Sequence, residues 1–254
     1  MGSMDERERR EQYEYERRRA ARRAARRKQR RRENAVKTVC IFCFVIILAV
    51  VGIQLKNFLK DRAKNSITET VEETKVVTTP PDYDVQLLDV NEYSRPGIAI
   101  EKVNGIVIHY TANPGTTAQQ NRDYFQGLRF SGETYASSHF VIGLSGELIQ
   151  CIPCNEIAYA SNDRNADTIS IECCIPDDTG EFAEPTYNTL VHLVAWLVGR
   201  YELDVEDVIR HYDVTGKNCP KYYVEHEAAW EQLKKDIRDY IDIYGTTENL
   251  PNDS

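Results

Sequence analysis

Apolar residues are distributed unevenly along this chain, and their pattern divides it into regions of different character. The first 37 residues are dominated by charged side chains, whereas residues 38–55, TVCIFCFVIILAVVGIQL, contain no charged residue. Residues 56–84 are polar again and include a Pro-Pro pair. From residue 85 onward, short apolar runs alternate with segments of helical periodicity, a pattern typical of a globular domain.

Short runs in this last region predict β-strands, because they are brief, apolar and rich in β-branched residues. The sequence LSGEL around Gly146 predicts a hairpin turn between the second and third runs. The predicted strands are Gly105–Tyr110, Ser138–Gly143, Glu147–Ile152 and Thr168–Cys173.

Helical periodicity appears in residues 116–128, 186–203 and 225–244. The first segment begins with two threonines suited to cap a helix. The other two carry apolar stripes, made of Leu190, Val194, Leu197 and Tyr201 in one and of Ala229, Leu233, Ile237 and Ile241 in the other. Strands mixed with helices, including one hairpin, predict a mixed α/β fold in which a central mixed β-sheet is flanked by helices.

The uncharged segment 38–55 predicts one transmembrane helix that precedes this fold, because a spanning helix needs about 20 apolar residues. The arginine-rich tail before it places the N-terminus in the cytoplasm and the C-terminal domain outside the cell. No small-residue cleavage signal follows the segment, so we expect an uncleaved anchor in the cell membrane. The predicted order is a basic cytoplasmic tail (1–37), the transmembrane helix (38–55), an extracellular linker (56–84), a catalytic domain (85–245) and a disordered tail (246–254).

The charge of the chain is as uneven as its hydrophobicity. The net charge is −8, but residues 1–32 carry about +8 and the remainder about −16. An acidic domain repels phosphate backbones, so we expect no nucleic-acid partner for it. The basic tail fits a role in membrane topology and in attraction to anionic lipid headgroups. Binding of nucleic acid by the tail alone remains an alternative.

The stretch RHYDVTGKNCP, residues 210–220, is read as a loop and carries candidate metal ligands. His211 and Cys219 lie eight positions apart in it, and His109 ends the most apolar predicted strand. Functional groups gather at strand ends, where the sheet holds them rigidly and leaves them accessible. Three such ligands suit a catalytic zinc ion, which keeps a fourth position for water. The alternative is a structural histidine and an unremarkable loop thiol.

Two charged residues complete the candidate chemistry. Glu172 is a carboxylate within an apolar strand, where its burial is costly unless it has a partner. Zinc lowers the pKa of bound water to about 7, and a neighbouring base such as Glu172 would accept the proton of that water. Lys217 could stabilise an oxyanion. The alternatives are a glutamate exposed on an edge strand and a solvated loop lysine.

Four blocks of this sequence, GIVIHYTA, SSHFVIG with SGELIQ, DTISIECC and RHYDVTGKNCP, resemble those of the zinc-dependent type-2 N-acetylmuramoyl-L-alanine amidases. This family includes the phage lysozyme-type amidases and shares its fold with the peptidoglycan recognition proteins. The resemblance covers residues 104–244. It implies a peptidoglycan recognition protein-like amidase fold and hydrolysis of the amide bond between N-acetylmuramic acid and L-alanine in peptidoglycan.

The resemblance also implies a role for each matching residue. The metal ligands for Zn²⁺ would be His109, His211 and Cys219, the catalytic residues Glu172 as general base and Lys217 as carbonyl polariser, and the substrate-binding residue His139. Phage enzymes carry a tyrosine where this chain has Ser138, so the resemblance gives Glu172 the greater catalytic weight. Residues 160–168, a polar loop before the Glu172 strand, are expected to contact the stem peptide.

Other functions compete with this hypothesis. Related recognition domains bind wall fragments without cutting them, so a membrane-anchored, non-catalytic peptidoglycan-binding module is the main alternative. A membrane-tethered structural component of a division, sporulation or secretion complex is another. Four further cysteines could form a disulfide or remain reduced core thiols, and a CIPC redox pair is a weaker possibility; these cysteines are Cys151, Cys154, Cys173 and Cys174.

Overall fold

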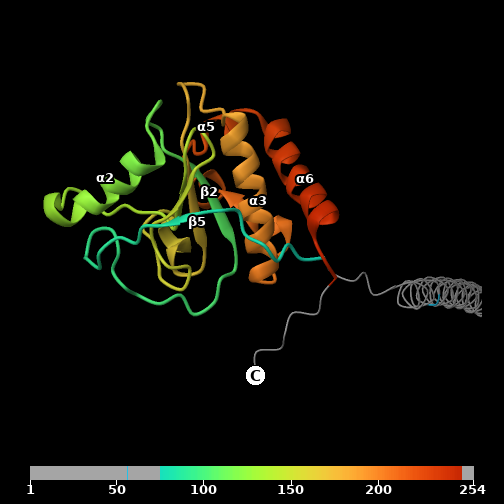
Figure 1. The fold of residues 1–254 in the computed structure, drawn as a ribbon, viewed down its shortest axis with the longest axis horizontal. Helices are drawn as coiled ribbons and strands as arrows, with labels where there is room; N and C mark the ends of the chain where they lie inside the picture. Colours follow the sequence, from blue (N-terminus) through green and yellow to red (C-terminus); the bar gives the residue numbers. More distant parts are fainter. Residues whose placement is uncertain (1–55, 57–74, 248–254) are drawn as a thin grey trace, which may run out of the picture. The chain divides into compact units, whose positions relative to one another are not determined.

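The structure is a computed structural model that describes residue 56 and residues 75–247 of the chain (Figure 1). The strands are β1 (Asp84–Val85), β2 (Ile106–Tyr110), β3 (Phe140–Ile142), β4 (Leu148–Gln150), β5 (Ile169–Cys173) and β6 (Val208–Arg210). They form one six-stranded sheet in the order β1-β4-β3-β5-β2-β6. β3 and β4 are antiparallel, whereas β5 and β6 both run parallel to β2. The predicted mixed sheet and its hairpin are therefore confirmed.

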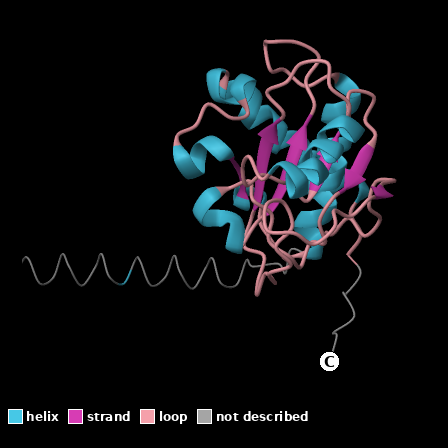
Figure 2. Ribbon diagram, turned by 90° about the vertical axis from the view of Figure 1, so that its left-hand side faces the viewer, coloured by secondary structure: helices cyan, strands magenta, loops and turns pink. Residues whose placement is uncertain are grey.

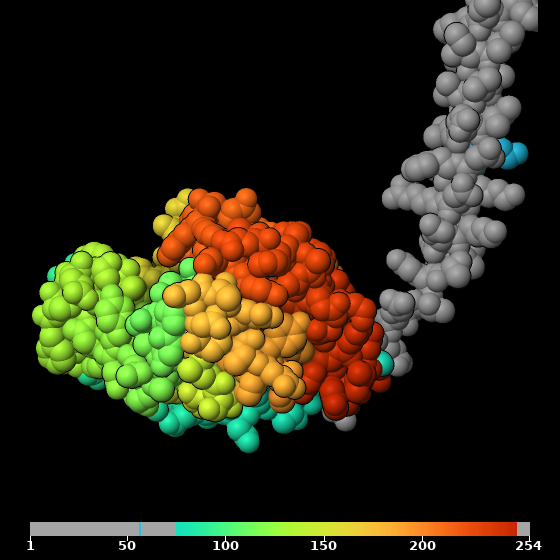
Figure 3. Space-filling model, turned by 90° about the horizontal axis from the view of Figure 1, so that it is seen from above, coloured from blue at the N-terminus to red at the C-terminus, as the bar shows by residue number. Residues whose placement is uncertain are grey.

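Long helices cover the two faces of this sheet. Their bounds are Ala118–Ser131 for α2, Glu184–Arg200 for α3 and Glu227–Tyr244 for α6. Figure 1 shows α3 and α6 side by side, with α2 on the other side of the strands, and Figure 2 shows helices on both sides of the strands. In the space-filling view, α2 lies at one end of the folded unit and α6 at the other (Figure 3). The shorter helices are η1 (Asn162–Ala166), η2 (Val205–Asp207), α4 (His211–Thr215) and α5 (Lys221–Glu225).

The start of α2 shows how local sequence determines an element boundary. The side chain of Thr117 accepts a hydrogen bond from the backbone N–H of Gln120, and the side chain of Gln120 accepts one from Thr117 in return. This reciprocal capping box satisfies two amide groups that the helix leaves without partners. The helix ends at Gly132, whose φ of 60° is left-handed and costs a glycine little. The predicted threonine cap is confirmed.

Strand alternation separates the main core from the face that carries the candidate chemistry. Ile106, Ile108, Ile169 and Ile171 are fully buried in one cluster with residues of α3 and α6. Side chains at intervening positions of a strand point to the opposite face. His109 and Glu172 occupy such positions, and they pair in register between β2 and β5. The face they share is the one on which α2 packs, since Val141, which pairs with Glu172, belongs to the α2 cluster.

The stretch RHYDVTGKNCP departs from the sequence prediction. It was read as a loop, but Val208–Arg210 form β6 and His211–Thr215 form α4. β1, with two residues, was not predicted either. α4 spans five residues, which is less than two helical turns, and β1 spans two residues, so neither is long enough to display a repeated apolar pattern.

The N-terminal edge of the folded unit also differs from the expected boundary. Residues 75–84 were assigned to the linker, yet Val77 is buried and Val76 exchanges two backbone hydrogen bonds with Thr246, at 3.0 and 2.9 Å. The folded unit therefore includes residues on both sides of the predicted 85–245 range. The predicted basic tail and the predicted span over residues 38–55 lie outside the described residues. Among the residues that are described, no helix is both long enough and apolar enough to cross a membrane.

Candidate metal centre and catalytic site

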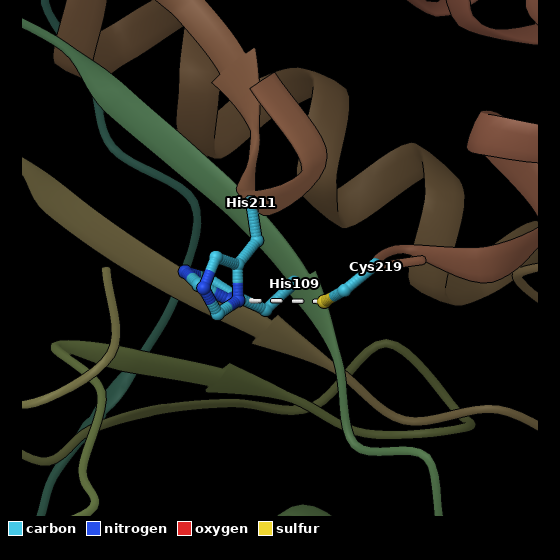
Figure 4. A group of neighbouring side chains, drawn as sticks. All are labelled: His109, His211 and Cys219. Atoms are coloured by element: carbon cyan, nitrogen blue, oxygen red, sulfur yellow. Dashed lines mark hydrogen bonds between the residues drawn. The ribbon is translucent and has the colours of Figure 1, made fainter. Parts of the chain in front are cut away.

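Three side chains from separate elements converge at one end of β2 (Figure 4). His109 comes from β2, His211 is the first residue of α4, and Cys219 lies in the segment between α4 and α5. Their ligand atoms all lie within 4.8 Å of one another, and all three residues are buried. His109 Nδ1 is 3.8 Å from Cys219 Sγ, and the two imidazole centroids are 4.7 Å apart. The structure therefore brings together the three ligands proposed from the sequence.

The pairing of β6 with β2 explains why His211 reaches His109. Ile108 of β2 is in register with Arg210 of β6, and the strands are parallel, so the next residue of each lies at the same edge of the sheet. Gly216, with a φ of 77°, ends α4 and turns the chain back. The backbone N–H of Tyr212 then donates to the carbonyl of Cys219 at 2.9 Å, which closes the loop that carries the thiol.

The buried side chain of Arg210 connects the start of α4 to neighbouring helices. The Arg210 guanidinium donates to Asp213 at 2.9 Å, to Glu227 at 2.7 Å and to the carbonyl of Tyr223 at 2.9 Å. A buried charge persists in a fold when carboxylates and carbonyls satisfy its donors in this way. These bonds tie α4 to α5 and α6, so the backbone next to His211 is fixed on three sides.

Burial sets the protonation of the three candidate ligands. It holds the pKa of His109 well below its usual range, and the nearby His211 and Lys217 lower it further. Burial and the charge of Lys217 also lower the pKa of His211, so both rings are neutral at pH 7 and can offer a lone pair. Burial raises the pKa of the Cys219 thiol to about 12. Metal binding would replace that thiol proton. Two neutral imidazoles and one thiol are a donor set that fits zinc.

Glu172 is placed beside this cluster by the register of two parallel strands. It lies directly opposite His109, and its Oε2 atom is buried with no hydrogen-bond partner among the described residues. Burial raises the pKa of this carboxyl to about 8, against an opposing effect of the Lys217 charge. A carboxyl group with a pKa near neutral can both accept and donate a proton at pH 7, which is the requirement for a general acid–base catalyst.

Lys217 is an exposed residue at the rim of the site. It follows Gly216 in the turn that leads to Cys219, and its carbonyl accepts a hydrogen bond from the Cys219 N–H at 2.7 Å. Its positive charge acts on the pKa values of the carboxyl group and of all three candidate ligands. The ammonium group is therefore close enough to influence negative charge that develops in the site.

The structure does not place His139 in the site. This histidine is 1% exposed, and both of its ring nitrogens are engaged. Nδ1 accepts a hydrogen bond from the backbone N–H of Ser170 at 3.0 Å, and Nε2 donates to the carbonyl of Glu156 at 2.8 Å. A ring fixed between two backbone groups has no free nitrogen for a substrate. His139 instead joins the start of β3 to β5 and to the segment after β4.

The polar loop before β5 supplies two contacts that the sequence did not reveal. Ser161 Oγ lies 3.2 Å from His109 Nε2, and Asn162 Oδ1 lies 3.1 Å from His211 Nε2. The loop was expected to contact peptide because of its polarity, and polarity alone does not distinguish a substrate contact from a contact with a ligand residue. The four further cysteines that were considered for a disulfide, Cys151, Cys154, Cys173 and Cys174, are free thiols.

Comparison with known proteins finds a family model and several curated proteins that are similar to this domain. Residues 99–222 match the family model Amidase_2, described as N-acetylmuramoyl-L-alanine amidase. The N-acetylmuramoyl-L-alanine amidase CwlL of Bacillus licheniformis is 37% identical over 161 residues, covering 58% of this chain and 44% of that protein. BlyA of Bacillus subtilis (strain 168), also named an N-acetylmuramoyl-L-alanine amidase, is 33% identical over 172 residues, covering 59% of this chain and 45% of that protein. The chain thus spans a little under half the length of these curated relatives.

A solved structure supports the fold. The solution structure of the PlyG catalytic domain superposes with a TM-score of 0.55 and 23% identity, covering 67% of this chain and all of that domain. Sheet order, helix placement and the buried His-His-Cys cluster define an α/β domain with a candidate metal site beside a carboxylate. Residues 99–222, which contain every residue of that site, match the N-acetylmuramoyl-L-alanine amidase family model.

Proposed function

We propose that this chain is a zinc-dependent N-acetylmuramoyl-L-alanine amidase that hydrolyses the amide bond between N-acetylmuramic acid and L-alanine of peptidoglycan. The observation that carries the proposal is the juxtaposition of three buried ligand atoms within 4.8 Å of one another and a carboxyl group on the adjacent strand. The match of the same segment to the family model supports the choice of bond.

The residues that would hold the zinc ion are His109, His211 and Cys219, since their donor atoms match the preferred ligands of this ion. A zinc ion bound there would polarise the substrate carbonyl and lower the pKa of a bound water molecule to about 7. The site fits a cation because it is a buried group of two neutral rings and one thiol. A carboxyl oxygen beside it has no hydrogen-bond partner among residues 75–247.

Glu172 is proposed to move the protons of the reaction. Its carboxylate accepts a proton from the attacking water molecule and donates it to the departing amine of L-alanine. Its raised pKa suits the second half of this cycle, because a carboxyl group with a pKa about 8 retains a proton long enough to donate it. The Lys217 charge opposes that rise, which keeps part of the population ionised and ready for the first half.

Lys217 is proposed to stabilise negative charge on the carbonyl oxygen as the tetrahedral intermediate forms. A cation positioned where charge develops lowers the barrier without stabilising the uncharged substrate equally. Lys217 lies in the short turn between Gly216 and Cys219, two residues before a proposed zinc ligand.

Digestion of purified peptidoglycan followed by mass spectrometry of the products tests the proposal. We expect lactyl-amide cleavage with new L-alanine N-termini, loss of cleavage with a chelator, and its restoration by zinc. Glu172→Gln should abolish cleavage and keep zinc, whereas Ser131→Ala, an exposed change at the end of α2, should leave cleavage intact. Wall binding without any cleavage by the wild-type chain would instead support the non-catalytic binding module.

We also propose that a single helix over residues 38–55 anchors the chain in the cell membrane, with its C-terminal domain on the wall side. The uncharged segment and the arginine-rich tail that precedes it support this orientation. Membrane fractionation combined with protease treatment of intact cells tests it. The C-terminal domain should be digested from outside, whereas a tag at the N-terminus should be protected.

A further inference from the structure

Consecutive residues of the loop before β5 contact both histidines of the metal site. His109 has its Nδ1 atom on the side of Cys219, and its other nitrogen, Nε2, lies 3.2 Å from the Ser161 hydroxyl. His211 Nε2 lies 3.1 Å from the side-chain carbonyl of Asn162. Each ring is thus held on Nε2, which leaves Nδ1 for a cation.

The chemistry of these contacts is compatible with the same tautomer for both rings, with the proton on Nε2. The Oδ1 atom of Asn162 only accepts hydrogen bonds, so His211 must carry its proton on Nε2 and keep the lone pair on Nδ1. The Ser161 hydroxyl can accept from His109 Nε2–H, the arrangement that keeps the lone pair of His109 on Nδ1 beside Cys219. A histidine that binds a metal through one nitrogen almost always donates its other N–H to such a partner, which orients the ring and increases its basicity.

The loop itself is held in a shape that presents these two acceptors. The side-chain carbonyl of Asn165 accepts from the backbone N–H groups of Ala160 at 3.0 Å and of Ser161 at 2.6 Å. Asn162 has a φ of 53°, a left-handed conformation that asparagine tolerates better than most residues. Ser161 is 1% exposed, so its hydroxyl has a defined environment rather than bulk solvent around it.

We propose that Ser161 and Asn162 are positioning residues that orient His109 and His211 for metal binding. The proposal rests on the zinc site of the proposed function. It adds that the loop 160–165 orients the two histidine ligands of that site through hydrogen bonds. Loss of such a partner lowers metal affinity by about 10- to 100-fold. Ser161 is buried and should fall within this range, whereas Asn162 is exposed to solvent and should show a smaller loss.

The zinc affinity of the full-length chain tests the proposal. Bound metal is first removed, and the affinity for added zinc is then measured by competition with a chromogenic chelator. The variants are Ser161→Ala and Asn162→Gly, the second of which keeps the left-handed backbone and removes only the side-chain carbonyl. Asn162→Asp restores an acceptor oxygen and should recover affinity. The controls are Ser131→Ala and Asn188→Ala, exposed changes in α2 and α3, and Cys219→Ser defines binding outside the site.

The absorption spectrum of the cobalt-substituted protein gives a second readout, since its bands report the geometry of the ligands rather than the stability of the fold. We expect altered bands for Ser161→Ala and wild-type bands for both controls. Zinc affinity and cobalt bands of Ser161→Ala equal to those of Ser131→Ala would overturn the proposal. If Ser161→Ala does not fold, the zinc affinities of Asn162→Gly and Asn162→Asp are compared instead. Equal affinities of these two variants would refute the proposal. A wild-type chain whose zinc binding does not depend on Cys219 would refute the metal site and the proposed function as well.

Discussion

Replacing Glu172 by glutamine should stabilise the metal-free protein increasingly as the pH rises, while it abolishes hydrolysis. The substitution keeps the size of the side chain and removes a charge that is buried at Oε2 without a hydrogen-bond partner among the described residues. In the wild-type protein this carboxylate is the proton acceptor that the proposed reaction needs. Stability and activity therefore make opposite demands on this position.

The size of the effect follows from the pKa of the carboxyl group. Burial raises that pKa from 4.5 to about 8 in the metal-free protein. One pKa unit corresponds to about 1.4 kcal/mol, so the ionised carboxylate lowers the free energy of unfolding by about 3 to 5 kcal/mol above pH 8. Because the folded-state pKa is the raised one, the stabilising contribution of the protonated group is complete below about pH 4.5 and is lost as the pH rises to about 8.

Glutamine does not titrate, so the difference in unfolding free energy between variant and wild type should grow across this window. It should reach about 3 kcal/mol of pH-dependent change by pH 7. A buried amide without a partner costs about 1 to 3 kcal/mol of its own, but that cost is the same at every pH. The slope of the difference against pH therefore reports the carboxyl group alone.

Urea denaturation of the metal-free proteins at several pH values between 5 and 8 measures this slope. Trp196 and Trp230 are buried, so their fluorescence follows the unfolding of the α3–α6 side of the domain. Glu231→Gln, a change on the exposed surface of α6, is the control for removal of a carboxylate as such. A difference that stays constant from pH 5 to pH 8 would refute the desolvation of Glu172. Addition of zinc should shrink the difference, because a nearby cation favours the carboxylate.

Other predictions concern the remaining parts of the site. Cys219→Ser should lower zinc occupancy, measured by atomic absorption, and wild-type affinity should rise with pH because the thiol must lose its proton. Lys217→Met should keep zinc but reduce kcat by about a hundredfold; an unchanged kcat would remove the lysine from the mechanism. Arg210→Met should lower the free energy of unfolding by about 2 to 4 kcal/mol, since it leaves buried acceptors unpaired. Denaturation midpoints check this result against the exposed Lys235→Met, and equal midpoints would contradict it.

The parts of the fold that the sequence predicts are those with a repeated pattern. β2, β3, β4 and β5 are buried and rich in β-branched residues, and the long helices carry apolar stripes such as Leu233 and Ile237 in α6. β6 has three residues and gains its stability from pairing with β2, about one hundred positions earlier in the chain. No local pattern encodes such a pairing, so the sequence does not predict the strand that places His211.

The site shows the same division between local and non-local information. The positions of His109, His211 and Cys219 suggested them as one group, because the first ends the most apolar predicted strand and the other two lie eight positions apart in one stretch. His139 has the same chemistry, but its partners are the Ser170 N–H and the Glu156 carbonyl, backbone groups that every sequence contains. Ser161 is an ordinary residue of a polar loop until the fold places it against a histidine.

The strand order explains why groups so far apart in sequence meet at one point. β2 lies between β5 and β6, and both neighbours run parallel to it, so one brings Glu172 and the other brings His211 to the position of His109. The arrangement depends on register. A shift of β5 by one residue would turn its side chains to opposite faces, which would move Glu172 into the apolar cluster of α3 and α6. In that cluster the carboxylate would lose the Lys217 charge that opposes the rise of its pKa in the present register, so the register that assembles the site is favoured.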